Sequence, residues 1–511
     1  MISQLSLDNT WKESSAEPFI RKTSAHNVIY SDDHPEKSNI VVMHHKQSYE
    51  SYDSLNITPG NNDLSTLSGG KVSRTSFISS VILILQVTMG IGSLALPRGF
   101  SFVGVFWGIL LTLFYAVANL ITLNMLASVT DKYKVYEFGK LIRKALGEKH
   151  ENIYNYTLVI SNYLVMVAYT NIIYDLLGIT IYDFFYSGNS EFIDSSDFMK
   201  NSFWNEYSTI VPIKYGLSFI ILLPLGLAKH LSGLEISSYL GMGALFYTMI
   251  IIIIQSPDYW EHYQNTGCKE SDPSTYANWF DIKRSFGKEL LFFSVNANLM
   301  YSFDLQYAVV PVYKTMQDNS LQSMKKLNLL AIVISTITYL IYCFFGFLTS
   351  PNNPPELIIF RVSIYQTDML MTIAKISLVV CIIGEIALIF ACLRISFFQI
   401  YKKSERFNNK ENIVLLVMVY FLSSTLATFL ENVVFYISLI GGLTTVLYCF
   451  VYPGLIYIRA FKLPKGSMKR LAIIAMISFI TSLGLVCGII DIVNIVREKI
   501  ELAQEKQMFH H

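Results

Sequence analysis

An uncharged stretch runs from Thr75 to Pro97 and ends in the segment GIGSLALP over residues 90–97. A run of this length can cross a bilayer, which needs about 20 residues of helix. Two glycines and a proline interrupt it, and a broken helix in lipid leaves backbone groups that must face protein or a water-filled cavity. We therefore predict a broken membrane helix at a binding site. The free backbone amides at the break and the positive end of the second half-helix suit a substrate carboxylate. The alternative is that Gly90 and Gly92 only allow close helix packing.

Charged residues are scarce along the whole chain. They make up 15% of its 511 residues, hydrophobic residues make up 52%, and the mean hydropathy is +0.41. Soluble proteins carry about 25% charged residues, so this composition predicts an all-α polytopic membrane protein surrounded by a lipid bilayer. The net charge of +1 favours no nucleic-acid partner. Cys268 is the one cysteine in a candidate loop, and no Cys/His spacing is typical of a metal site.

The apolar runs predict about eleven membrane spans. They cover residues 77–97, 102–129, 153–183, 211–228, 236–255, 289–313, 327–349, 367–393, 412–430, 433–458 and 470–493. The basic amphipathic segment 132–149 is expected to form a helix between the second and third spans. We expect residues 1–74 to be a disordered cytosolic tail, 75–495 the transmembrane domain and 496–511 a short C-terminal tail.

The distribution of lysine and arginine predicts the orientation. Basic residues cluster after the second, sixth, eighth and tenth spans, within 132–149, 314–326, 402–410 and 459–470. The positive-inside rule then places these loops and the N-terminus in the cytosol. The loop 256–288 also holds four basic residues, but acidic residues balance them.

Three motifs resemble the amino acid/auxin permease family, which lies within the amino acid-polyamine-organocation superfamily. Residues 90–97 resemble its first-helix pattern, G-x-G-x-L-x-L-P. Residues 301–313, YSFDLQYAVVPVY, resemble its sixth-helix pattern, F-x-F followed by a histidine and P-x-Y, with Gln306 at the histidine position. Residues 438–442, SLIGG, and the later Tyr452-Pro453 resemble its tenth-helix pattern. The motifs occur in the family's order, and the resemblance runs from about residue 73 to 495.

The resemblance implies a LeuT-type fold of two inverted five-span repeats and one extra helix. The spacing agrees, because interrupted segments in corresponding halves indicate an inverted-repeat transporter. Substrate is then expected at the breaks of the first and sixth spans. The implied binding residues are Gly90, Ile91, Gly92, Ser93, Ser302 and Phe303. Phe303 could equally be an ordinary packed aromatic residue.

Three polar side chains are candidates for ion or proton coupling. Gln86 lies one turn before Gly90, where sodium-coupled members resembling this family often have an asparagine. An interhelical hydrogen bond is its alternative role. Asp304 and Glu385 are carboxylates deep in the sixth and eighth spans, where such groups are costly and normally functional or paired. We expect them to carry the coupling proton; the alternative is pairing with a buried amide or cation, for example Asn296 or Asn298.

The resemblance implies a secondary active amino acid transporter that works by alternating access. Because Gln86 replaces the asparagine of sodium-coupled members, and because Asp304 and Glu385 can hold protons, we expect a symporter with protons as the coupling ion. A sodium-coupled transporter and a transporter-like amino acid sensor are the alternatives. No catalytic residue set or phosphate-binding loop stands out, so neither an enzyme nor a cofactor is expected. The expected location is the plasma membrane or a vacuolar or lysosomal membrane.

Overall fold

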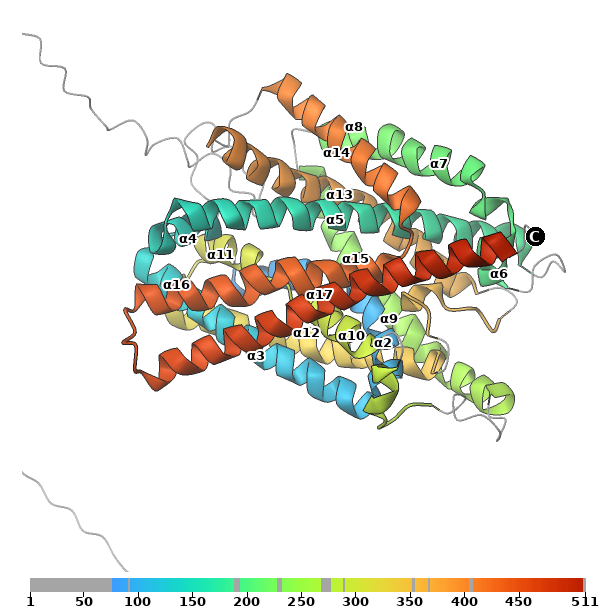
Figure 1. Cartoon of the computed structure of the whole chain (residues 1–511), viewed down its shortest axis with the longest axis horizontal. Coiled ribbons are helices and arrows are strands. Elements are labelled where there is room, and N and C mark those ends of the chain that lie inside the picture. Colours follow the sequence, from blue (N-terminus) through green and yellow to red (C-terminus); the bar gives the residue numbers. More distant parts are fainter. Residues whose placement is uncertain are drawn as a thin grey trace, which may run out of the picture. The chain divides into compact units, whose positions relative to one another are not determined.

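The structure is a computed structural model. It describes residues 76–508 apart from 91, 188–193, 228–231, 268–276, 288–289, 352–353, 366–367 and 404–407. Within these residues every regular element is helical (Figure 1), so the all-α fold class is confirmed. The tail 1–74 lies outside the described residues, and its disorder stays a prediction.

The helices of the N-terminal half follow the predicted spans closely. They are α1 (Phe77–Thr88), α2 (Gly92–Val103), α3 (Val105–Tyr133), α4 (Phe138–Leu146), α5 (Glu148–Ile181), α6 (Ser195–Asn201), α7 (Tyr207–Gly216), α8 (Leu223–Leu227) and α9 (Ser232–Gly267). Short 3₁₀- or π-helical segments are η2 (Tyr182–Tyr186), η3 (Phe203–Asn205) and η4 (Leu217–Leu222). The predicted amphipathic helix is α4.

The C-terminal half agrees equally well. Its α-helices are α10 (Leu291–Ser302), α11 (Gln306–Thr315), α12 (Leu321–Thr349), α13 (Met369–Lys402), α14 (Asn409–Phe429), α15 (Val433–Leu439), α16 (Tyr452–Ala460) and α17 (Met468–Met508). The short segments are η6 (Ile282–Phe286), η7 (Ile358–Phe360), η8 (Ile440–Thr445) and η9 (Leu447–Val451). Because α17 continues to Met508, it includes most of the segment expected as a C-terminal tail.

Nine of the described helices are long and apolar enough to cross a membrane, and the pair α1 and α2, bent by 59° at its break, brings the number to ten. The shorter α10 and α11 occupy the predicted sixth span, with three residues, Phe303–Leu305, between them. The expected break in that span is therefore present, although it contains no glycine. The total of eleven spans stays a prediction.

Helices from the two halves pair in a reciprocal way. The third span, α5, packs on the eighth, α13; the second, α3, packs on the seventh, α12; and α2 of the first packs on α10 of the sixth. Figure 1 shows α5 and α13 running alongside each other, as do α3 and α12. Each of these pairs joins corresponding spans of the two predicted repeats.

Four further contacts form two matched pairs. The fourth span contacts the eighth through α8 and α13, and the ninth contacts the third through α14 and α5. The fifth contacts the seventh through α9 and α12, and the tenth contacts the second through α16 and α3. Exchanging the two five-span halves leaves this set of neighbours unchanged, as an internal two-fold relation requires. An odd number of spans in each half also inverts one half relative to the other.

The glycines of the SLIGG segment serve close packing. A Cβ atom on Gly441 would lie 2.0 Å from the carbonyl oxygen of Ala297 in α10, and one on Gly442 would lie 2.7 Å from the carbonyl oxygen of Gly484 in α17. Backbone therefore meets backbone on both sides of η8. Only glycine permits this approach, so the segment seats the tenth span between the sixth and the eleventh.

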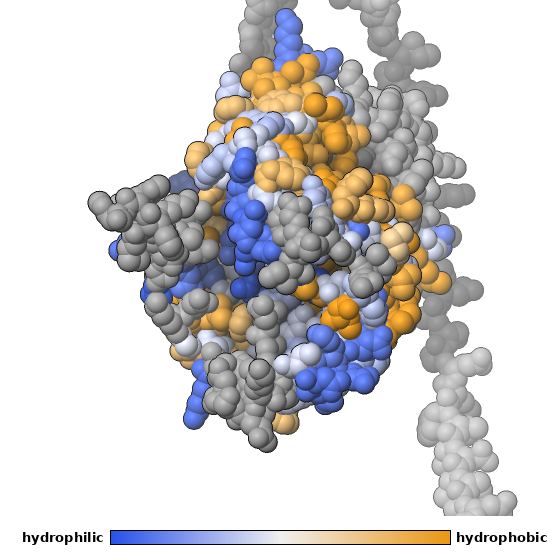
Figure 2. All heavy atoms as spheres, turned by 90° about the vertical axis from the view of Figure 1, so that its right-hand side faces the viewer, coloured by the Kyte–Doolittle hydropathy of each residue, from blue (hydrophilic) through white to orange (hydrophobic). Residues whose placement is uncertain are grey.

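The basic loop regions meet at one end of the helix bundle. The Lys403 Nζ atom lies 2.6 Å from a carboxylate oxygen of Glu148, the Lys132 ammonium group donates to the carbonyl of Ala460, and Asn319 Nδ2 lies 3.3 Å from the hydroxyl of Tyr136. These contacts join the loops after the second, sixth, eighth and tenth spans. Figure 2 shows the opposite end, where hydrophilic residues occupy the middle and lower part of the face and hydrophobic residues its upper and right-hand flanks.

This grouping generates a topology prediction. Epitope tags inserted at residue 40 and within 402–410 should face the cytosol, and a tag within 262–275 should face the other side, because basic loops remain inside. Antibody access in intact and permeabilised cells measures the sides. Finding the tag at residue 40 on the same side as the one in 262–275 would contradict the assigned orientation.

Candidate functional site

The breaks of the first and sixth spans face each other. A Cβ atom on Gly92, the first residue of α2, would lie 2.9 Å from the Tyr301 ring and 3.2 Å from the Ser302 hydroxyl oxygen at the end of α10. The glycine lets the two broken spans touch at this point. The packing interpretation of Gly92 therefore agrees with the structure, and its role toward substrate stays a prediction.

Tyr339 of α12 joins the two breaks. Its hydroxyl oxygen lies 2.7 Å from the carbonyl oxygen of Thr88, the last residue of α1, and 2.6 Å from that of Ser302, the last residue of α10. Both carbonyls stand at half-helix C-termini, which carry partial negative charge. Tyr339 was not among the residues predicted from the sequence. The available signal was a hydroxyl in the middle of an apolar span, where polar groups need partners.

Two of the predicted substrate-binding residues, Ser93 and Ser302, lie at the breaks, but their hydroxyl groups already donate to backbone carbonyls. The Ser93 hydroxyl donates to the Gly90 carbonyl at 2.8 Å, and the Ser302 hydroxyl donates to the Asn298 carbonyl at 2.8 Å. Phe303 is fully buried, and its ring packs edge-on against Tyr339 with centroids 5.1 Å apart. Phe303 is therefore a packed aromatic residue in this structure. Ile91 lies outside the described residues.

Glu385 reaches the first break through Tyr169 of α5. The Tyr169 hydroxyl donates to the Glu385 carboxylate at 2.9 Å, and the same hydroxyl oxygen would lie 3.9 Å from a Cβ atom on Gly90. A Cβ atom on Gly241 of α9 would lie 3.4 Å from the other Glu385 carboxylate oxygen. Glu385 of the eighth span is thus connected to the broken first span through the Tyr169 hydroxyl.

Asp304 lies in the break of the sixth span, two residues before α11 begins. The Tyr448 hydroxyl donates to one carboxylate oxygen, and the Cys449 Sγ atom lies 3.5 Å from the other. Ser161 and Thr445 place their hydroxyl oxygens 3.4 Å and 3.2 Å from that of Tyr448. The N-terminus of a helix stabilises a nearby anion, so α11 favours the carboxylate at this position.

Neither carboxylate pairs with the asparagines considered from the sequence. The Asn296 side-chain oxygen accepts from Tyr115 at 2.9 Å, and that of Asn298 accepts from Ser438 at 2.8 Å. No lysine or arginine among the described residues lies within ion-pair distance of Asp304 or Glu385. Two carboxylates are therefore half-buried beside the breaks, with hydroxyl and thiol partners but without a compensating cation among the described residues.

Gln306 anchors the start of α11. Its side-chain nitrogen lies 2.8 Å from the Asn119 side-chain oxygen and 3.1 Å from the Thr122 hydroxyl of α3, and 3.3 Å from the Cys449 carbonyl. Its side-chain oxygen accepts from the Leu305 amide at 3.2 Å. All these groups are buried, so the residue at the family's histidine position holds the inner half of the sixth span on the second and tenth spans.

Gln86 makes no interhelical hydrogen bond with the described residues of this structure. It is half-buried on α1, and none of the side-chain hydrogen bonds among the described residues involves it. Its predicted interhelical hydrogen bond is therefore not formed, and its part in ion coupling stays untested.

On α13, Lys375 is buried and forms a 2.7 Å ion pair with Asp183. The Lys375 side chain thus lies within the protein and does not extend to the membrane surface.

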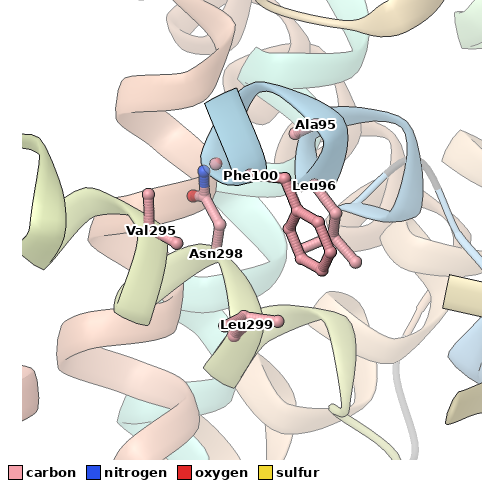
Figure 3. Close-up of a pocket in the computed structure, with 7 residues that line it drawn as sticks. Ala95, Leu96, Phe100, Val295, Asn298 and Leu299 are labelled. Carbon is pink, nitrogen blue, oxygen red and sulfur yellow. The ribbon is translucent and has the colours of Figure 1, made fainter. Parts of the chain in front are cut away.

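A crevice separates α2 from α10 beside the breaks (Figure 3). Leu96 and Phe100 of α2 lie across it from Val295, Asn298 and Leu299 of α10. It has no room for a water molecule. The broken spans are closely packed here, so an amino acid could enter this crevice only after they separate.

Comparisons with known proteins agree with this geometry. A family model described as transmembrane amino acid transporter protein matches residues 73–495. A Danio rerio protein named sodium-coupled neutral amino acid symporter 2 is 23% identical over 459 residues, which cover 88% of this chain and 84% of that protein. The crystal structure of MhsT in complex with L-phenylalanine matches with a TM-score of 0.50 and 14% identity, covering 84% of this chain and 99% of that one. This likeness confirms the expected LeuT-type fold.

The contact at Gly92 generates a mutational prediction. Gly92→Val should reduce amino acid uptake into proteoliposomes by about 100-fold, because the added side chain must push Tyr301 and Ser302 away, and a displacement of about 1 Å at a site has an effect of this size. The matched control is Gly243→Val in α9, where a Cβ atom meets nothing within 4 Å. Uptake should be normalised to monodisperse protein. Normal uptake by Gly92→Val would show that this position is not part of the site.

Proposed function

Because the chain belongs to the transmembrane amino acid transporter family, the amino acid/auxin permease family that its motifs resemble, we propose that it moves amino acids across a membrane by alternating access. The family is one of transporters rather than enzymes. The observation that carries the proposal is the pair of facing breaks, joined by one tyrosine hydroxyl, at the centre of two inverted repeats. The protein is an integral, multi-pass membrane protein. We place its N-terminus in the cytosol and the protein in the plasma membrane or a vacuolar or lysosomal membrane.

The breaks offer complementary groups to an amino acid. The start of α2 at Gly92 presents backbone amides and a positive half-helix end, which suit the substrate carboxylate. The carbonyls of Thr88 and Ser302 end α1 and α10, and their partial negative charge suits the ammonium group. A carbonyl oxygen has two lone pairs, so each can accept from Tyr339 and from the substrate together. The name of the Danio rerio relative supports a neutral amino acid.

Asp304 and Glu385 are the proposed coupling residues. A half-buried carboxylate without a neighbouring cation is unfavourable while charged, so it is more stable with a proton or with a bound cation. Each accepts a tyrosine hydroxyl, from Tyr448 or Tyr169, which fixes its orientation in the closed state. We propose that a proton occupies at least one of them when the site is closed to water and leaves when the site opens.

Sodium coupling is the second candidate, and the relative named a sodium-coupled symporter favours it. The carboxylate of Glu385, next to Gly90 and Tyr169, could hold a cation as well as a proton. Uptake of each of the twenty amino acids into proteoliposomes, with pH and sodium gradients imposed separately, tests the function and its coupling. Saturable binding without net flux would instead identify an amino acid sensor.

The coupling proposal predicts the behaviour of two amide variants. Asp304→Asn and Glu385→Gln resemble the protonated side chains, so they should retain substrate exchange. At least one should lose accumulation driven by a pH gradient, which for one pH unit is at most about tenfold per coupled proton. The exposed carboxylate Glu206 provides the control, because Glu206→Gln should accumulate substrate normally. Full pH-driven accumulation by both variants, or wild-type uptake that needs sodium and ignores pH, would contradict the proton proposal.

A further inference from the structure

Tyr339 has one hydroxyl proton and two carbonyl acceptors. Its oxygen lies 2.7 Å from the Thr88 carbonyl and 2.6 Å from the Ser302 carbonyl, and both distances are those of hydrogen bonds. A hydroxyl donates one hydrogen bond at a time. The hydroxyl can therefore donate to the Thr88 carbonyl of the first span or to the Ser302 carbonyl of the sixth span, but not to both together.

Few other hydrogen-bond donors are available to these two carbonyls. Neither receives a backbone N–H from the described residues, since the helices that they end are interrupted directly afterwards. An unsatisfied carbonyl buried in a membrane protein is costly. The Tyr339 hydroxyl thus donates a hydrogen bond to the last carbonyl of α1 or to the last carbonyl of α10, one at a time.

The rest of α12 holds the hydroxyl in place. Tyr339 is fully buried, its ring packs edge-on against Phe303 between the half-helices of the sixth span, and α12 packs along both α1 and α2. The seventh span is therefore in contact with both broken spans at the level of their breaks. Displacing either break by more than about 0.5 Å would lengthen its carbonyl contact beyond normal hydrogen-bond distance.

We propose that Tyr339 is a positioning residue for substrate binding: its shared hydroxyl proton holds the breaks of the first and sixth spans in the relative position that the amino acid requires. This inference rests on the proposed transport function. At whichever carbonyl it donates to, the hydroxyl uses one lone pair and leaves the other available to the substrate. The substrate then binds to breaks that are already aligned, and its affinity includes no cost for bringing them together.

The inference predicts a separation of KM from Vmax. Without the hydroxyl the two breaks are no longer aligned before substrate arrives, so KM should rise by about tenfold, the effect of one buried hydrogen bond. Saturating substrate itself brings the breaks together, so Vmax per folded protein should change less than about threefold. A purely structural role would instead reduce the amount of active carrier, which lowers Vmax and leaves KM unchanged.

The test compares Tyr339→Phe with Tyr342→Phe in proteoliposomes, using the amino acid that the wild type takes up best among the twenty. Tyr342 is one turn further along α12, is equally buried, and donates to the Leu245 carbonyl of α9, away from the breaks. Its variant should keep KM within about twofold of the wild type, whereas Tyr339→Phe should raise it.

Incorporation of 4-aminophenylalanine at position 339 supplies the complementary variant. Its neutral amino group has two N–H donors and can serve both carbonyls together, so KM should return to within about threefold of the wild-type value. This variant also carries the test if Tyr339→Phe does not fold. An unchanged KM in Tyr339→Phe, an equal rise in Tyr342→Phe, or no recovery with 4-aminophenylalanine would overturn the inference. A wild type that takes up none of the twenty amino acids would overturn the proposed function itself.

Discussion

Backbone polar groups inside a bilayer must find partners within the protein, and the two broken spans depend on this constraint. Each break leaves a half-helix end without its regular hydrogen bonds. The fold surrounds both ends with other helices and provides one hydroxyl, that of Tyr339, at the last carbonyl of each. Close approach at Gly92 and Gly441 brings the neighbouring backbones near enough for this arrangement. The breaks are thus stable because they are enclosed together, and neither would be stable alone in lipid.

The repeat architecture explains why the breaks meet. Corresponding spans of the two halves pack on each other, so an interruption in the first span lies opposite the interruption in the sixth. The third span, α5, supports both carboxylates of the site. Tyr169 contacts Glu385, and Ser161 contacts the hydroxyl of Tyr448 that donates to Asp304. These two α5 residues are eight positions apart, about 12 Å along the helix, so one span connects two levels of the proposed pathway.

Ion pairs of the described residues lie towards the two ends of the helix bundle, and the carboxylates between the ends have none. Most ion pairs of the described residues lie at the end with the basic loops, as between Lys403 and Glu148. Buried Lys375 is paired with Asp183 towards the other end. Between the two ends, Asp304 and Glu385 have polar partners without an ion pair. A charge left uncompensated at the centre of a carrier suits a cation that arrives and leaves with the substrate.

The sequence by itself determined the all-α class, the span positions, the grouping of basic loops and the family, because apolar runs, lysine and arginine counts and short motifs are local properties of the chain. It also located the break at Asp304, although the resemblance rather than a glycine indicated it. Only the tertiary structure decided the partners: Tyr169, Tyr448 and Tyr339 come from spans distant in sequence, and a hydroxyl within an apolar run is a signal that they share with other tyrosines. The same holds for Phe303, buried against Tyr339, and for Lys375, paired within the protein. A polar side chain in a membrane span needs hydrogen-bond partners on neighbouring helices. Those helices are distant in sequence, so only their packing determines which partners the side chain has.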